Sequence, residues 1–125
     1  MYPTAKQPKV LLLEREQRSA SIISVLTRAE FDVIQAQDPD EAWATLQAHE
    51  DVDVLLADID IPSPMDGVEL GQYVQERWPG LGLVLTSDQV RHLRPDEVPG
   101  DSCFLPHPIP ADTLLKEIRL AVRRH

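Results

Sequence analysis

The sequence predicts an α/β fold built on one doubly wound parallel sheet of five strands. Short apolar runs alternate along the chain with segments in which apolar residues recur at helical spacing. The run from Val54 to Ala57 is apolar at every position, which is typical of a central parallel strand buried on both faces. Strands that alternate with helices are joined by right-handed crossovers, and repeated crossovers give a doubly wound sheet.

The five expected strands are short and mostly apolar. They are Val10–Leu13, Phe31–Ile34, Val54–Asp58, Leu81–Leu85 and Ser102–Leu105. Their expected order across the sheet is 2-1-3-4-5, the flavodoxin-like arrangement. A nucleotide-binding version of this fold would need a glycine-rich turn after the first strand. The residues there are Glu14-Arg15-Glu16, so we discard that function.

The helices are predicted from apolar periodicity and from capping residues. Asp38, Pro39 and Glu41 supply a cap, a first-turn proline and a capping-box acid, which together form the clearest helix start in the chain. The expected helices are Glu16–Ala29, one beginning at Asp38, one lined by Leu70, Val74 and Trp78, a short one at Gln89–Leu93, and a terminal one with an apolar stripe from Leu114 to Val122.

Length and composition favour one domain that acts through protein contacts. The chain has 125 residues, and we expect a loose polar arm over residues 1–8 followed by a domain over residues 9–125. It contains no apolar run long enough for a membrane span and no basic-then-apolar leader. A single cysteine, Cys103, suits a reducing cytoplasm. The net charge of -9 argues against a nucleic-acid partner.

A single carboxylate ends the central strand. Asp58 follows the apolar run, Pro62 comes four residues later, and Met65-Asp66-Gly67 opens the next periodic segment. In open α/β sheets, ligand chemistry lies beyond the carboxyl ends of the strands. This pattern resembles the receiver domain of bacterial response regulators, in which an Asp at the end of the third strand accepts a phosphoryl group. The loop here holds one extra residue.

The resemblance extends from Lys9 to the terminal helix and implies roles for further strand-end residues. Glu14 matches the first of two acids that help to hold Mg²⁺ beside the phosphoacceptor. Thr86 matches the hydroxyl that bonds a phosphoryl oxygen, and Phe104 matches the aromatic residue whose rotamer reports activation.

Other matched positions concern the last strand and the rim of the site. His107-Pro108 stands where the family has a Lys-Pro pair, and the family's peptide bond at that point is cis. Asp60 and Asp88 lie two residues beyond the acceptor and the hydroxyl, where receivers tune loss of the phosphoryl group.

Two positions depart from the family pattern. Arg15 stands where the second acid, the more direct metal ligand, is expected, so an oxygen ligand is lost and a fixed positive charge is gained. His107 replaces the family's lysine and is only partly charged near its reference pKa of about 6.5. Mg²⁺ at Glu14 and Asp58 is therefore expected to bind weakly or not at all. Arg15 is expected to pair with Asp58, Glu14 or Asp60.

Two functions follow from the resemblance. The first is a stand-alone, atypical receiver in a two-component phosphorelay, in which a sensor histidine kinase or phosphotransfer protein donates to Asp58. The second is a phosphorylation-independent pseudo-receiver, a protein interaction module in which Arg15 replaces the metal. A hydrolase that uses Asp58 as nucleophile would need a general acid and a substrate pocket that the sequence does not indicate, so we do not expect an enzyme.

In both cases the output surface is expected on the last strand, the segment from Gln89 and the terminal helix. The outer positions of that helix are basic, although the chain as a whole is acidic. A downstream acidic protein or a second copy of the chain would complement them. These basic residues are Lys116, Arg119, Arg123 and Arg124.

Overall fold

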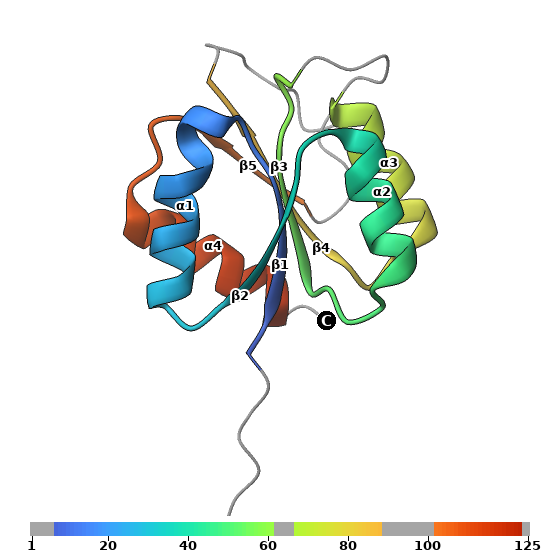
Figure 1. The fold of residues 1–125 in the computed structure, drawn as a ribbon, viewed down its shortest axis with the longest axis horizontal. Coiled ribbons are helices and arrows are strands. Elements are labelled where there is room, and N and C mark those ends of the chain that lie inside the picture. The colour runs from blue at the N-terminus through green and yellow to red at the C-terminus, as the bar shows by residue number, and fades with distance from the viewer. Residues whose placement is uncertain (1–6, 62–66, 89–101, 124–125) are drawn as a thin grey trace, which may run out of the picture.

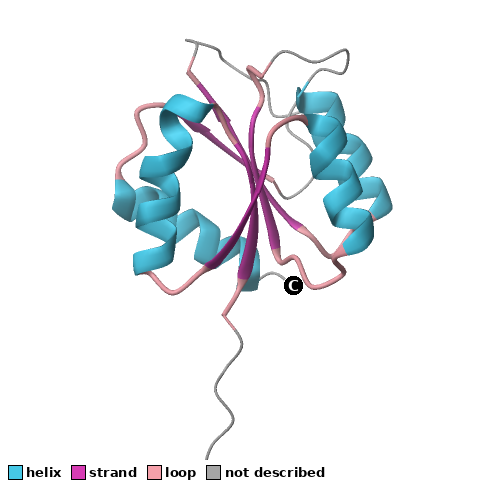
Figure 2. Cartoon of the chain, in the orientation of Figure 1, coloured by secondary structure: helices cyan, strands magenta, loops and turns pink. Residues whose placement is uncertain are grey.

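Five parallel strands form a single sheet in the order β2-β1-β3-β4-β5, so the predicted fold class and strand order are confirmed. The computed structural model describes residues 7–61, 67–88 and 102–123. Helices α1 and α4 cover one face of the sheet, and α2 and α3 cover the other (Figure 1). The layered arrangement of helices around the strands is also clear in Figure 2.

The observed elements keep close to the expected bounds. The strands are β1 (Lys9–Leu13), β2 (Asp32–Ala36), β3 (Val54–Asp58), β4 (Gly82–Ser87) and β5 (Cys103–Pro106). The helices are α1 (Glu16–Arg28), α2 (Pro39–Ala48), α3 (Gly67–Arg77) and α4 (Ala111–Arg123). The expected short helix at Gln89–Leu93 lies outside the described residues, as do Pro62, Met65, Asp66 and most of the arm.

Two apolar clusters hold the layers together, one on each face of the sheet. Successive residues of a strand point to opposite faces, so Leu11 and Leu55 join the cluster under α2 and α3. Leu12 and Leu56 join the cluster under α1 and α4. Every residue of β3 is buried, which agrees with the prediction of a central strand and places Asp58 at the edge of a rigid core.

The end of α1 explains why β2 begins one residue later than expected. Glu30 has a left-handed backbone with φ of 68°. The Phe31 N–H donates to the Leu26 carbonyl and the Glu30 N–H to the Thr27 carbonyl, which is the hydrogen-bond pattern of a Schellman motif. Phe31 is thus held in this turn, packed in the same apolar cluster as Leu26, and is not part of the strand.

The start of α2 confirms the predicted cap. The Asp38 side chain accepts a hydrogen bond from the Glu41 backbone N–H at 2.7 Å, and Pro39 occupies the first turn. This cap fixes where the chain leaves β2 and enters the helix.

Among the described residues, none of the helices is both long and apolar enough to cross a membrane.

Candidate functional site

The register of the sheet brings the predicted site residues to one edge. Asp58, the last residue of β3, pairs with Thr86 of β4, and Leu13 of β1 pairs with Ala57. Glu14 follows β1 directly, so its side chain reaches the same edge. The Thr86 hydroxyl donates to Glu14 Oε2 at 3.1 Å. Asp58, Thr86 and Glu14 are all buried, so they form the floor of the site.

Arg15 lies against the candidate phosphoacceptor. Its Nε is 3.4 Å from Asp58 Oδ2, and its guanidinium donates to the Asp60 backbone carbonyl at 3.4 Å. Arg15 is the N-cap residue of α1, and its own carbonyl accepts from the backbone N–H groups of Arg18 and Ser19. The backbone therefore begins the helix while the side chain extends across to the end of β3. The pairing expected between Arg15 and Asp58 is present.

The Asp58 carboxylate has a different environment at each oxygen. Oδ1 accepts a hydrogen bond from the Asp60 backbone N–H at 2.7 Å. Oδ2 has no hydrogen-bond partner within the described part of the chain, and its compensation is the Arg15 charge. The Asp58 side chain is 0% exposed and that of Arg15 is 36% exposed, so the ion pair is open to solvent on the arginine side only.

Glu14 is held in its neutral form at neutral pH. Burial raises its pKa to about 8, and the neighbouring Asp58 carboxyl contributes to the rise in the same direction. A carboxyl beside another carboxylate in a water-poor site gives up its proton reluctantly, because both charges would be buried together. Glu14 and Asp58 thus carry one negative charge between them, and Arg15 neutralises it.

His107 does not supply the positive charge of the lysine that it replaces. Its side chain is 5% exposed, and Nε2 lies 3.6 Å from Glu14 Oε2. Burial lowers the pKa of His107, and the nearby charge of Arg18 lowers it further. The imidazole is therefore mainly neutral at pH 7. The His107–Pro108 peptide is cis, as expected, and the His107 N–H donates to the Ser87 carbonyl at 2.7 Å.

A network at the rim joins α1 to the ends of β3 and β4. Asp60 accepts hydrogen bonds from the Ser87 hydroxyl at 2.8 Å and from the Asp88 N–H at 2.7 Å. The Arg18 guanidinium bonds to Asp88 and lowers the pKa of that carboxyl. Arg15 Nη1 also lies 3.8 Å from Asp88 Oδ2. Arg15 and Arg18, at the start of α1, therefore bind acids at the ends of two different strands, Asp58 of β3 and Asp88 after β4.

The sequence reasoning missed Arg18 and Ser87. A signal for Arg18 was available, because residues three apart on a helix share a face, and Arg15 was already placed at the site. Ser87 follows Thr86 directly, and because neighbouring strand residues point to opposite faces, no signal in the sequence placed its hydroxyl at the site.

Phe104 pairs with Leu85 across β4 and β5. Its side chain is partly buried and packs against the apolar cluster under α2 and α3. This is a core contact, so the role of Phe104 as a switch stays a prediction.

The residues present do not fit Mg²⁺. The position of the more direct ligand carries a guanidinium, and Glu14 would have to lose a proton to act as a hard anionic ligand. Within the described ranges, no group of three His, Cys, Asp or Glu side chains is arranged to hold a metal ion. The positive charge that the acids require comes from the chain itself.

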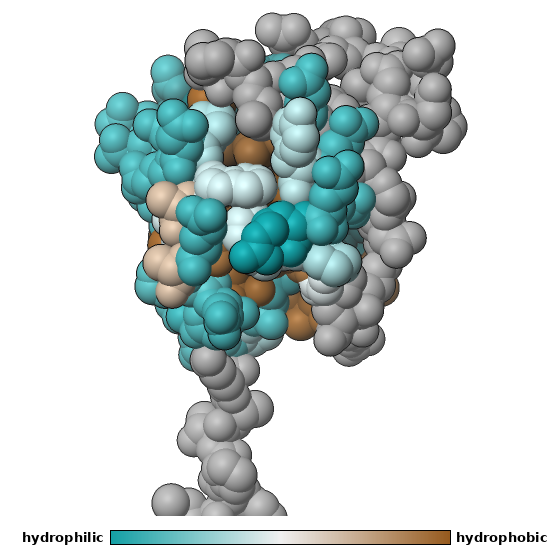
Figure 3. Space-filling view, turned by 90° about the vertical axis from the view of Figure 1, so that its right-hand side faces the viewer, coloured by the Kyte–Doolittle hydropathy of each residue, from teal (hydrophilic) through white to brown (hydrophobic). Residues whose placement is uncertain are grey.

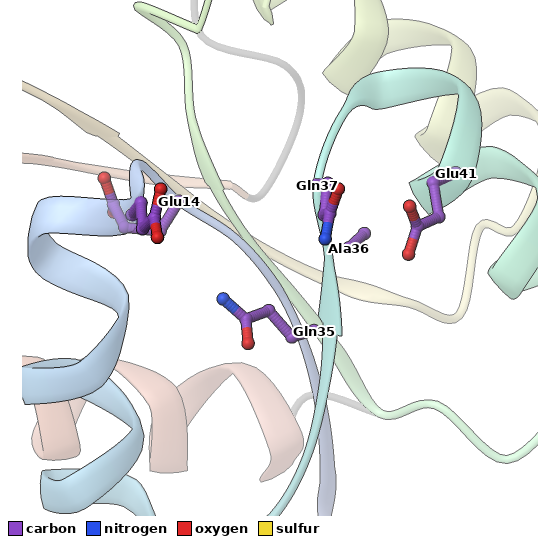
Figure 4. Close-up of a pocket in the computed structure, with 6 residues that line it drawn as sticks. Glu14, Gln35, Ala36, Gln37 and Glu41 are labelled. Atoms are coloured by element: carbon purple, nitrogen blue, oxygen red, sulfur yellow. The ribbon is translucent and has the colours of Figure 1, made fainter.

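A polar pocket of about 500 Å³ adjoins the site (Figure 4). It lies between the start of α1 and the connection from β2 to α2. Its lining consists mainly of acids and amides: Glu14, Glu16, Gln35, Ala36, Gln37 and Glu41. The pocket lies beside Glu14 and offers little apolar surface to a ligand.

Comparison with known proteins identifies the family. The model of the response regulator receiver domain matches residues 10–119, so the chain belongs to the response regulator receiver family. Its role therefore lies in two-component signalling, where receiver domains interact with kinases or phosphotransfer proteins. No curated protein sequence matches the chain significantly.

Solved structures of receiver domains share the fold. A response regulator receiver protein from Sinorhizobium medicae WSM419 superposes with a TM-score of 0.85 at 21% identity, covering 96% of this chain and 98% of that one. The chemotaxis protein CheY4 of Vibrio cholerae gives a TM-score of 0.80 at 23% identity, covering 92% and 98%. The signal receiver domain of an HD domain-containing protein from Pseudomonas fluorescens Pf-5 gives 0.81 at 21%, covering 94% and 96%.

Proposed function

We propose that this receiver domain is a protein interaction module whose output does not depend on phosphorylation of Asp58. The observation that carries the proposal is the ion pair between Arg15 Nε and Asp58 Oδ2 at 3.4 Å. In a phosphorylated receiver, a divalent cation must neutralise the charge that gathers when a phosphoryl group reaches a carboxylate. Here a guanidinium lies at that place, and it cannot bridge acceptor and phosphoryl oxygens as a metal ion does.

The neighbouring groups support the same function. Thr86 donates its hydrogen bond to Glu14, and His107 is buried and mainly neutral. The Thr86 hydroxyl is therefore already used as a donor, and His107 offers no positive charge to a bound phosphoryl group. An arginine stays charged at physiological pH, so the site holds one electrostatic state whether or not a divalent cation is available.

The surface for a partner is best sought on α4 and β5. Lys116 and Arg119 are exposed on α4, and Leu120, 37% exposed, lies beside them. An exposed apolar side chain next to cations, on a chain of net charge -9, suits an acidic protein surface with an apolar contact. A second copy of the chain is the alternative occupant of this surface.

Intact-mass spectrometry after incubation with Mg²⁺ and acetyl phosphate or phosphoramidate tests the proposal. We expect no phosphoryl adduct on the wild type and a measurable adduct on Arg15→Asp, because that substitution returns an oxygen ligand to the site. Asp58→Asn in the Arg15→Asp background is the matched control and should abolish the adduct. A stoichiometric adduct on the wild type that disappears in Asp58→Asn would reject the proposal.

A second candidate function, phosphorylation of Asp58 by a kinase, is favoured by one observation. Asp58 ends β3 opposite Thr86, and its Oδ2 accepts no hydrogen bond from an N–H or hydroxyl group of the described residues. This function requires Arg15 to leave Asp58 when a phosphoryl donor and Mg²⁺ arrive. The same mass measurement separates the two functions, since only this one gives an adduct on the wild type.

A further inference from the structure

We propose that a second site, at the opposite edge of the sheet from Asp58, binds a basic peptide segment through one apolar anchor residue. The site is a pocket of about 430 Å³ between the ends of α2 and α3. Asp53, which lines it, precedes β3, whereas Asp58 ends that strand. The two sites are thus separated by the length of β3, roughly 16 Å at about 3.3 Å per residue. The inference does not depend on the function proposed for Asp58.

The floor of this pocket is apolar and partly aromatic. It is lined by Leu46 from α2, Val52 from the entry to β3, and Trp78 and Leu81 from the turn after α3. In Figure 3, hydrophobic atoms are visible low on this face among hydrophilic side chains. The volume is that of a small ligand pocket, large enough for one aliphatic or aromatic side chain of a partner. Such a buried anchor supplies most of the affinity in many interfaces.

The aromatic part of the pocket is held in place by its neighbours. Trp78 contacts Trp43 edge-to-face with ring centroids 4.8 Å apart. The Arg77 guanidinium lies 5.1 Å from the Trp78 ring centroid. These contacts fix the indole ring, so little conformational entropy is lost when a ligand packs on it.

The rim of the pocket carries an excess of negative charge. Glu50 and Asp53 line it. Asp53 accepts a hydrogen bond from the Lys9 N–H at 2.8 Å, and the Lys9 ammonium is shared between Asp51 at 2.6 Å and Asp32 at 3.9 Å. Among the lining residues, the carboxylates of Glu50 and Asp53 outnumber the one guanidinium, that of Arg77, and the cluster of Lys9, Asp51 and Asp32 beside Asp53 adds one further negative charge. Because the chain as a whole is also acidic, a basic segment would be attracted from a distance and positioned at this rim.

The test uses the peptide acetyl-Lys-Lys-Phe-Lys-Lys-amide as the probe. Trp43→Phe keeps an aromatic ring beside Trp78 and leaves Trp78 as the only tryptophan, since the chain has two, so fluorescence of this variant reports on the pocket. We expect a saturable change in Trp78 emission with the basic peptide. Acetyl-Glu-Glu-Phe-Glu-Glu-amide and acetyl-Lys-Lys-Gly-Lys-Lys-amide should each bind at least about tenfold more weakly, a loss of about 1.4 kcal/mol.

Two variants connect binding with this pocket. Gly80 lines it, and a side chain added there meets no atom within 4 Å, so Gly80→Leu should fill the pocket without disturbing the fold. Glu50→Lys reverses a rim charge at an exposed position. Each variant should weaken binding about tenfold or more while its melting temperature stays near that of the parent.

Three results would overturn the inference. Equal binding of the basic and acidic peptides would show that the acidic rim does not select the ligand. Unchanged binding in Gly80→Leu would show that the peptide does not enter the pocket. Concentration-dependent self-association that is lost in both Gly80→Leu and Leu120→Ala would assign the pocket to a second copy of the chain. Arg15→Asp should leave peptide binding unchanged, so failure here is distinguishable from failure of the function proposed for Asp58.

Discussion

At the scale of single residues, the cation beside Asp58 determines the chemistry available to the site. A bound metal ion exchanges with solvent and presents several coordination positions to oxygen ligands. Arg15 is part of the chain, remains charged and offers only N–H donors. With Glu14 neutral, one buried negative charge faces one guanidinium. Under the proposed function, this arrangement is a stable ion pair in place of a reactive centre.

Replacing Arg15 by glutamine should lower the free energy of unfolding by about 1–3 kcal/mol, less than for a fully buried pair because the arginine is partly exposed. The cause is the uncompensated Asp58 carboxylate. Chemical denaturation at pH 7 measures the effect. Arg28→Gln, at the exposed far end of α1, is the control and should change stability by no more than about 0.5 kcal/mol. Equal effects of the two substitutions would argue against a stabilising role of the ion pair.

Replacing Glu14 by glutamine should change how stability depends on pH. Glu14 has a pKa of about 8 in the folded protein against the ordinary 4.5, so the folded state keeps a proton that the unfolded state has lost. Its contribution is present below pH 4.5 and is lost as pH rises through 8. Glutamine stays neutral, so the stability of Glu14→Gln relative to the wild type should increase across this window. Melting temperatures between pH 5 and 8.5 test the prediction.

His107 affects the pH dependence of stability in the opposite direction to Glu14. Both the wild type and Glu14→Gln contain His107, so its effect cancels when the two are compared. Its pKa is lowered by burial, so the unfolded state binds a proton more readily, and stability should fall as pH drops below 6.5. The exposed Glu16→Gln is the matched control for Glu14→Gln. A pH trend as large in Glu16→Gln would show that the effect does not come from the buried carboxyl.

The residues of the site could be predicted from sequence, but their interactions only in part. Residues at strand ends are visible in the chain, and the charge of Arg15 suggested its pairing with Asp58. The neutral states of Glu14 and His107 could not be predicted, because they result from burial under several elements. The Arg18–Asp88 pair joins residues 70 positions apart. It depends on how closely the fold brings the start of α1 to the end of β4, which the sequence does not specify.

At the scale of the elements, α1 ends without the glycine that usually stops a helix. Glu30 occupies the left-handed position of its Schellman motif, a conformation that costs an L-residue about 1 kcal/mol. Sequence periodicity predicted the helix to within a residue. The turn could not be predicted, since no Gly or Asn marks it and β2 was therefore placed one residue too early.

Glu30→Gly should accordingly stabilise the protein by about 0.5–1 kcal/mol, because glycine adopts positive φ without steric cost. The gain is limited by the greater entropy of glycine in the unfolded chain. Thermal or denaturant unfolding measures it. Glu30→Ala removes the same side chain but keeps the β-carbon, so it should give no such gain. Equal stabilisation by alanine would indicate that the side chain, and not the backbone, is the source.

The contact of β4 with α4 depends on a glycine. A β-carbon at Gly82 would lie 2.9 Å from Ala121 Cβ and 3.0 Å from the Ala121 carbonyl oxygen. Because the close atoms include backbone, the helix would have to shift. Gly82→Ala should therefore destabilise the protein by about 1–3 kcal/mol, whereas Gly80→Ala, two residues earlier and in open space, should be close to neutral. Similar unfolding free energies for both variants would contradict this account of the packing.

At the scale of the whole molecule, the two edges of the sheet carry different sites. The carboxyl edge holds the Arg15–Asp58 pair and the rim network, and the amino edge holds the apolar pocket with its acidic rim. The fold and the strand order could be predicted from alternation of elements, because they depend on which residues are apolar. The pocket at the amino edge could not, since it is formed by residues from α2, α3 and their connections that have no motif in the chain.

The central claim is that Arg15 takes the place of a metal ion beside Asp58. A crystal structure of the wild-type protein soaked in Mg²⁺ tests it most directly, with Arg15→Asp soaked in parallel as the control. We expect the wild type to keep Arg15 within ion-pair distance of Asp58 with no ion beside that carboxylate, and Arg15→Asp to show a coordinated ion there. Mg²⁺ bound beside Asp58 in the wild type, with Arg15 turned into solvent, would contradict the account.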